Sequence, residues 1–195
     1  MELKLRIVNF LSKNMGKSLT INEIAKSIGE YYSFVHRILG KLAEEEIVVK
    51  TKAGKSHICS LNLNNEKTKT LLQLSEIESR DEFYNKNREL KLILEDFTKS
   101  INPENVVTIV LFGSYAKGNA TKESDIDVLI VAERGSGIDK VTKEIYAKYG
   151  KEINAVMMTS DEFNKQKDRA LIKEIVASHC VLNGAENFVK MVFGK

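Results

Sequence analysis

The most informative part of this sequence lies between residues 111 and 131, where the chain runs Leu111-Phe-Gly-Ser-Tyr-Ala-Lys-Gly-Asn-Ala-Thr-Lys-Glu-Ser-Asp-Ile-Asp-Val-Leu-Ile-Val131. An apolar run over residues 106–112 ends at Gly113-Ser114, and a second apolar run over residues 128–131 follows two aspartates. Short apolar runs bounded by glycine and polar residues predict a strand, a tight turn that opens a helix, and a second strand.

The two aspartates near the start of the second strand, Asp125 and Asp127, predict a metal site. Alternate residues of a strand point to the same face, so both side chains project together. The carboxylates repel each other unless a cation lies between them, and hard oxygen ligands suit Mg²⁺. The Gly113-Ser114 turn offers backbone N–H groups and a hydroxyl to phosphate oxygens. Together these features indicate nucleotide chemistry.

This ordered motif resembles the signature of the DNA polymerase β-like nucleotidyltransferase superfamily, which has Gly-Ser, a spacer, and then Asp-hydrophobic-Asp-hydrophobic. The sequence Phe-Gly-Ser-Tyr-Ala-Lys-Gly is most similar to the minimal nucleotidyltransferases of bacteria and archaea, and the resemblance covers residues 86–195. It implies that Gly113 and Ser114 hold the triphosphate tail of a nucleotide. It also implies that Asp125 and Asp127 are catalytic and bind the Mg²⁺ cofactor.

One position departs from the family's pattern. A third carboxylate usually lies on the next strand, in a pattern like Gly-x-x-hydrophobic-Asp, where it accepts the proton of the attacking hydroxyl or shares the metal. The matching stretch here starts at Gly150, and Asn154 occupies the position of the acid. An amide cannot accept that proton. Glu152, on the same strand face roughly 6–7 Å away, is the candidate substitute, and whether the domain is an active enzyme stays open.

Composition limits the class of protein. With 195 residues, 43% of them hydrophobic, the chain can form one large or two small domains. We expect a cytoplasmic protein, because no apolar stretch approaches a membrane span and no signal peptide opens the chain. Cys59 and Cys180 match no disulfide framework or metal spacing. Residues 1–65 carry 10 Lys+Arg and 6 Asp+Glu, a basic surplus that suits a nucleic-acid partner.

The N-terminal third shows a pattern of helices followed by a hairpin. Thr20-x-x-Glu23 is a capping box that opens a short helix, and Gly29 ends it. Apolar residues at helical spacing mark the helices, and alternation around Ala53-Gly54 marks the hairpin. The expected elements are helices over residues 3–13, 21–28 and 33–45 and a hairpin over residues 47–61.

This order of elements resembles the winged helix-turn-helix of prokaryotic regulators such as the MarR group. The resemblance spans about residues 3–63 and implies a recognition helix over residues 33–45, which enters the DNA major groove. Lysines of the hairpin, the wing, would neutralise phosphates. The side chains assigned to double-stranded DNA are Tyr32, Ser33, His36, Arg37, Lys41, Lys50, Lys52 and Lys55. The alternative is a protein-docking or dimerisation module.

A helical connector is expected between the two parts. Residues 66–78 predict one helix, and the capping box Ser79-x-x-Glu82 predicts a second helix that runs to about Ser100, before Pro103. An apolar seam on this second helix either covers the sheet of the C-terminal domain or forms a dimer interface. The seam consists of Leu90, Leu94, Phe97 and Ile101.

The sequence therefore predicts an α+β protein in three parts. These are a winged helix-turn-helix over residues 1–64, a helical connector over 65–85, and an α/β nucleotidyltransferase domain with a small mixed sheet over 86–195. The expected function is a DNA-binding protein that transfers a nucleoside monophosphate from Mg-NTP, with ATP preferred, to a hydroxyl of a protein or small molecule. The alternative is a transcriptional regulator whose second domain only binds nucleotide or forms a homodimer, without turnover.

Overall fold

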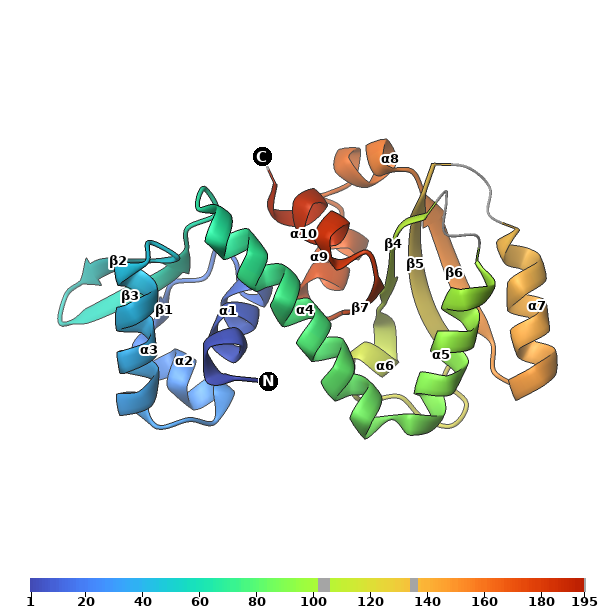
Figure 1. Cartoon of the computed structure of the whole chain (residues 1–195), viewed down its shortest axis with the longest axis horizontal. Coiled ribbons are helices and arrows are strands. Elements are labelled where there is room, and N and C mark those ends of the chain that lie inside the picture. Colours follow the sequence, from blue (N-terminus) through green and yellow to red (C-terminus); the bar gives the residue numbers. More distant parts are fainter. Residues whose placement is uncertain (102–105, 134–136, 195) are drawn as a thin grey trace. The chain divides into compact units, whose positions relative to one another are not determined.

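The computed structural model describes residues 1–101, 106–133 and 137–194 (Figure 1). The chain divides into two compact units, Met1–Glu78 with Phe193–Lys195, and Ser79–Val192. Pro103 lies outside the described residues.

The first unit combines helices with a small antiparallel sheet (Figure 1). Its sheet has the strand order β1-β3-β2, and both pairings are antiparallel. Side chains spaced along one face of each helix are buried, as Val35, Leu39 and Leu42 show. The elements are α1 (Leu3–Lys13), β1 (Leu19–Thr20), α2 (Ile21–Ile28), α3 (Tyr32–Glu44), β2 (Val48–Ala53) and β3 (Ser56–Leu61).

The predicted boundaries of α2 are confirmed. The Thr20 hydroxyl accepts a hydrogen bond from the Glu23 backbone N–H at 3.3 Å, and the Glu23 carboxylate accepts one from the Thr20 backbone N–H at 2.8 Å. Gly29 ends the helix with a φ of 67°, which glycine adopts without a steric penalty. Strand β1 was not predicted, because two residues are too few to show an alternation of polar and apolar side chains.

The connector differs from the prediction. Helix α4 runs unbroken over Glu66–Lys86, and α5 spans Arg88–Ser100, so no helix starts at Ser79. The N-cap residue of a helix has a non-helical backbone conformation. Near Ser79 no glycine or proline ends the preceding helix, so Ser79 stays helical and cannot act as an N-cap. The chain breaks instead at Asn87, where φ is −128° and ψ is 63°, and the Asn87 side chain donates a hydrogen bond to the Phe83 carbonyl at 2.8 Å.

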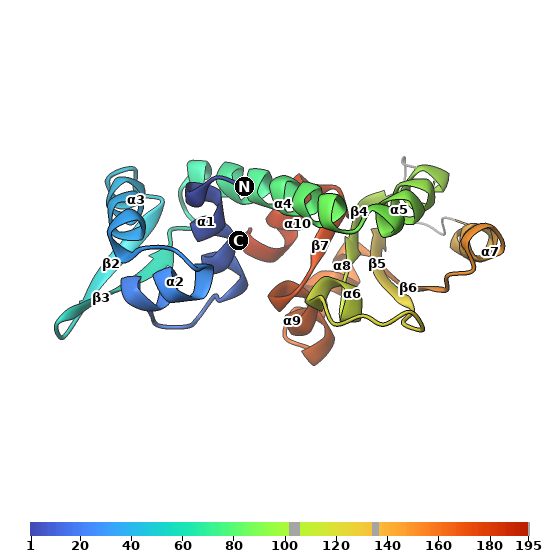
Figure 2. The same cartoon turned by 90° about the horizontal axis from the view of Figure 1, so that it is seen from below.

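The second unit is built around a four-stranded mixed sheet with helices on both faces (Figures 1 and 2). The strand order is β6-β5-β4-β7, in which β5 and β6 are parallel and the other pairs antiparallel. The elements after α5 are β4 (Val106–Leu111), α6 (Gly113–Lys117), β5 (Ile126–Ala132), α7 (Ile138–Tyr149), β6 (Ile153–Met158), α8 (Ser160–Lys165), α9 (Ala170–Ala177), β7 (Cys180–Asn183) and α10 (Ala185–Phe193).

Each face of this sheet has its own core. Val128 and Ile130 of β5 pack in the cluster that contains side chains of α5 and α7, whereas Leu129 and Val131 pack with side chains of α8, α9 and α10. This alternation is expected for a strand that is covered on both faces. The predicted apolar seam of α5 is buried against the sheet, which confirms the first of its two interpretations; its members are Leu90, Leu94, Phe97 and Ile101.

Both cysteines, Cys59 and Cys180, are buried. Within the described ranges, no helix combines the length and the apolar character needed to cross a membrane.

Candidate active site

The Gly113-Ser114 turn lies directly against one of the two predicted metal ligands. The Phe112 N–H donates a hydrogen bond to the Asp127 backbone carbonyl at 2.9 Å, which fixes the turn beside β5. Gly113 has a φ of 69°, and a Cβ atom added to it would lie 2.1 Å from Asp127 Oδ2. Only glycine therefore permits this approach, since any side chain would displace the carboxylate.

The chain between the turn and the aspartates is short and held by hydrogen bonds. Helix α6 makes a single turn and ends at Gly118, whose φ is 74°. The Asn119 N–H donates to the Ser114 carbonyl at 3.1 Å. Further on, the Thr121 N–H donates to the Ser124 hydroxyl at 2.9 Å, and the Ser124 N–H donates back to the Thr121 carbonyl at 3.3 Å. This second turn delivers Asp125 to the start of β5.

The predicted third-acid position lies beside Asp127. In the parallel pair of β5 and β6, Asp127 and Asn154 are register partners, and the Ile126 N–H donates to the Glu152 carbonyl at 2.9 Å. Asp127 is half-buried, whereas Asp125, Glu152 and Asn154 are exposed. The structure thus brings Gly113, Asp127 and Asn154 together at one end of the sheet, with the backbone of Glu152 beside them.

The electrostatic environment of Asp127 is unfavourable for a lone carboxylate. Burial raises the pKa of Asp127, the negative charges of Asp125 and Glu174 act in the same direction, and a side-chain hydrogen bond with Asn154 opposes them. A cation would offset this excess of negative charge, and carboxylate oxygens are the donors that Mg²⁺ prefers. The residues present therefore fit Mg²⁺.

The protein donors would complete only part of a metal shell. Among the described residues, no group of three or more His, Cys, Asp or Glu side chains is positioned to hold a metal ion. Magnesium usually keeps several water molecules and binds through one or two carboxylates plus substrate phosphates. Two aspartates beside the Gly113-Ser114 turn agree with that pattern.

Two charged residues at this site were not predicted from the sequence. Lys117 of α6 and Glu174 of α9 form an ion pair with an N–O distance of 2.5 Å. Glu174 also acts on the pKa of Asp127, so it faces the same end of the sheet. The two residues are 57 positions apart, and no motif links them. Only the position of Lys117 within the Gly-Ser segment could have drawn attention to it.

The side chains predicted to contact DNA lie on α3 and on the β2–β3 hairpin. Ser33, His36, Arg37 and Lys41 are exposed on α3; Lys52 and Lys55 are exposed on the hairpin, and Lys50 is half-buried there. The start of α3 also carries an exposed aromatic cluster, of which only Tyr32 was predicted to contact DNA. Tyr31 is 75%, Tyr32 51% and Phe34 45% exposed. The Arg37 guanidinium lies 5.6 Å from the centre of the Phe34 ring.

Comparison with known proteins identifies the second unit. The family model "Nucleotidyltransferase domain" matches residues 90–182, a range that includes β4 to β6 and all the site residues described above except those of α3 and the hairpin. The chain is 42% identical over 76 residues to Putative protein adenylyltransferase MJ0604 of Methanocaldococcus jannaschii, which covers 38% of this chain and 75% of that protein. The chain therefore belongs to the nucleotidyltransferase-domain family.

A second relative from the same organism, Putative protein adenylyltransferase MJ1305, is 26% identical over 112 residues, or 52% of this chain and 76% of that protein. No solved structure is significantly similar to the chain.

Proposed function

We propose that this protein transfers AMP from Mg²⁺-bound ATP to the hydroxyl of an acceptor protein and releases pyrophosphate. One observation supports this proposal most: Gly113 approaches Asp127 so closely that no Cβ atom fits between them. This contact places phosphate-binding backbone groups next to carboxylates that suit a metal ion. The protein acceptor is proposed because both relatives are named as protein adenylyltransferases.

The proposed roles follow from the positions of the side chains. Gly113 and Ser114 would orient the triphosphate through the backbone N–H groups and hydroxyl of the α6 turn. Asp125 and Asp127 would hold Mg²⁺, which when bound offsets the charge that develops on the phosphate oxygens. Asn154 hydrogen-bonds Asp127, so it orients that carboxylate and does not take up a proton.

The base for the attacking hydroxyl is proposed to be Glu152. Its carboxylate is exposed, and its backbone carbonyl is tied to Ile126, between the two aspartates in sequence. Glu174 is less suited to this role, because its carboxylate pairs with Lys117. If neither residue takes the proton, the domain binds nucleotide without turnover. Asn154 in place of an acid is the observation that favours this second candidate function.

We further propose three domains, residues 1–64, 65–85 and 86–195, of which the first is a winged helix-turn-helix that binds double-stranded DNA. The order of helices and strands, the exposed polar face of α3 and the exposed lysines of the hairpin support this proposal. The exposed aromatic cluster at the start of α3 favours the alternative, a protein-docking module, since aromatic side chains are enriched at protein interfaces.

Calorimetry with ATP and Mg²⁺ tests the nucleotide site. The full-length chain is expected to bind only with the metal present, and Asp125→Ala/Asp127→Ala should abolish binding. Asp139→Ala/Glu144→Ala removes the same charge from exposed positions of α7 and serves as the matched control. Unchanged affinity for ATP in Asp125→Ala/Asp127→Ala would rule out the assignment of these two residues as metal ligands. Incubation with α-labelled ATP, Mg²⁺ and cell extract then distinguishes the two functions, because labelled protein appears only with transfer.

A further inference from the structure

The second unit contains a cavity of about 790 Å³ that the proposed reaction does not use. It lies between the junction of α4 and α5 and the segment that follows α6. Cationic side chains from three separate parts of the chain line it: Lys86, Arg88, Lys122 and Lys151. Glu89 is the one carboxylate among its lining residues.

These four cations lack carboxylate partners among the described residues. Lys151 does have a partner, because its ammonium donates a hydrogen bond to the Lys122 backbone carbonyl, but that group carries no charge. The cavity therefore concentrates positive charge in a hollow where an anion would be attracted.

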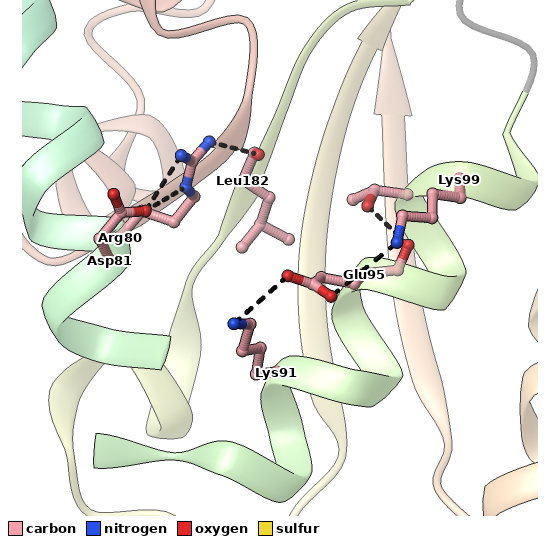
Figure 3. A network of polar contacts seen from close by, with 7 residues as sticks. Arg80, Asp81, Lys91, Glu95, Lys99 and Leu182 are labelled. Atoms are coloured by element: carbon pink, nitrogen blue, oxygen red, sulfur yellow. Dashed lines mark hydrogen bonds and ion pairs between the residues drawn. The ribbon is translucent and has the colours of Figure 1, made fainter. Parts of the chain in front are cut away.

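A neighbouring cavity of about 490 Å³ in the same unit shows the opposite arrangement (Figure 3). There Arg80 pairs with Asp81 at 3.0 Å and also points to the Leu182 carbonyl, while Lys91 pairs with Glu95 at 3.7 Å. Its cations are balanced by carboxylates of the protein itself. The cations of the first cavity thus lack the carboxylate partners that Arg80 and Lys91 have in the second.

We propose that the 790 Å³ cavity binds a small ligand that carries several phosphate groups, separate from the nucleotide held by Asp125 and Asp127. Clustered negative charge matches the four cations, and the planar guanidinium of Arg88 can hold two phosphate oxygens at once. The ligand is a free polyphosphate or the polyphosphate tail of a nucleotide. A hollow of this limited volume suits a small molecule better than a nucleic-acid strand.

The cavity adjoins the candidate active site through two short segments. Lys122 lies within the Thr121–Ser124 turn that precedes Asp125, and Lys151 immediately precedes Glu152. A ligand bound by these lysines would therefore contact the loops that carry Asp125 and Glu152. The proposal concerns binding alone and does not depend on transferase activity.

Titration calorimetry of the full-length chain with inorganic tripolyphosphate, at low salt and with EDTA, tests this proposal. Without a divalent cation, Asp125 and Asp127 repel the ligand, so binding reports on the cavity. Arg88→Gln/Lys122→Gln should weaken binding about tenfold or more, since hydrogen bonds to charged groups are lost. Lys165→Gln/Lys190→Gln removes the same charge from exposed helical positions and should leave affinity unchanged.

Further binding measurements distinguish this site from the nucleotide site and identify the kind of ligand. Asp125→Ala/Asp127→Ala should still bind tripolyphosphate, which separates this site from the nucleotide site. ATP that competes with tripolyphosphate identifies a nucleotide tail as the natural ligand, whereas failure to compete identifies free polyphosphate. Three results would each overturn the proposal. They are an equal loss of tripolyphosphate affinity in both glutamine double variants, no binding of tripolyphosphate by the wild type, and binding of a short oligonucleotide but not of tripolyphosphate. Thermal melts of every variant verify that the fold is intact.

Discussion

At the scale of single residues, the contact between Gly113 and Asp127 sets the shape of the site. Gly113→Ala should abolish Mg-ATP binding, because its new Cβ would lie 2.1 Å from Asp127 Oδ2 in a backbone conformation that already disfavours side chains. Gly118→Ala is the matched control, since its φ is similar but nothing lies within 4 Å of the added atom. The control should cost only the backbone strain, about 1–3 kcal/mol of stability, and should retain binding in calorimetry. Equal ATP affinity in the two variants would contradict the steric argument.

The proposed roles of Asn154 and Glu152 concern how the proton leaves the attacking hydroxyl. If Glu152 is the base, Glu152→Gln should lower transfer by about 10²–10⁴-fold, and Asn154→Asp should change it little. If the domain has lost its base, Asn154→Asp should instead raise residual transfer while ATP affinity stays within a few-fold. Single-turnover labelling of both variants distinguishes these cases. If the wild type and both variants show no transfer but still bind nucleotide, the result supports the function in which the domain only binds nucleotide.

The raised pKa of Asp127 makes stability depend on pH in a defined direction. The folded state holds the Asp127 proton to a higher pH than the unfolded state, so this group stabilises the fold only at low pH, and its contribution falls as pH rises through the folded pKa. Asp127→Asn should therefore melt at a higher temperature than the wild type at neutral pH without metal. The difference should vanish below the unfolded pKa of aspartate, where both side chains are neutral. A variant that melts lower at neutral pH would contradict this account.

At the scale of elements, α3 and the hairpin make different contributions to the proposed DNA complex. Arg37→Ala should cost about 1–3 kcal/mol of affinity for a preferred site if this side chain contacts a guanine edge. Lys52→Ala should weaken binding to all DNA sequences alike and lower the salt dependence of binding, because the Lys52 side chain would contact phosphate. Fluorescence anisotropy of full-length variants measures both effects, with Lys140→Ala in α7 as control. If the full chain binds no double-stranded DNA even at low salt, the docking alternative replaces DNA binding.

Elements with strong local signals were predicted well from the sequence. Helix α2 has the predicted bounds, because its capping box and Gly29 define them together. The helix start predicted at Ser79 is wrong, which shows the limit of such signals: the same capping pattern can lie inside a continuous helix. The pairing of Lys117 with Glu174 could not be predicted, because it depends on how α9 packs against the sheet.

At the scale of the whole molecule, the two candidate sites of the second unit differ in how clearly the sequence indicates them. The ordered Gly-Ser and Asp-x-Asp motif indicated both the fold and the site of the second unit, because nucleotide chemistry restricts residue types at each position. The 790 Å³ cavity shows no comparable signal in the sequence. Its cations come from residues 86–88, 122 and 151, and only the folded chain brings them together.

The pairing of β7 with β4 has a consequence for how this protein is made. Leu111 of β4 pairs with Cys180 of β7, so β4 gains its second neighbour only from a strand near the end of the second unit. While the ribosome is still adding residues before 180, β4 presents an unpaired, strongly apolar edge that invites association with other chains. The nascent chain, more than the finished protein, is then the form in which this sheet most needs a chaperone.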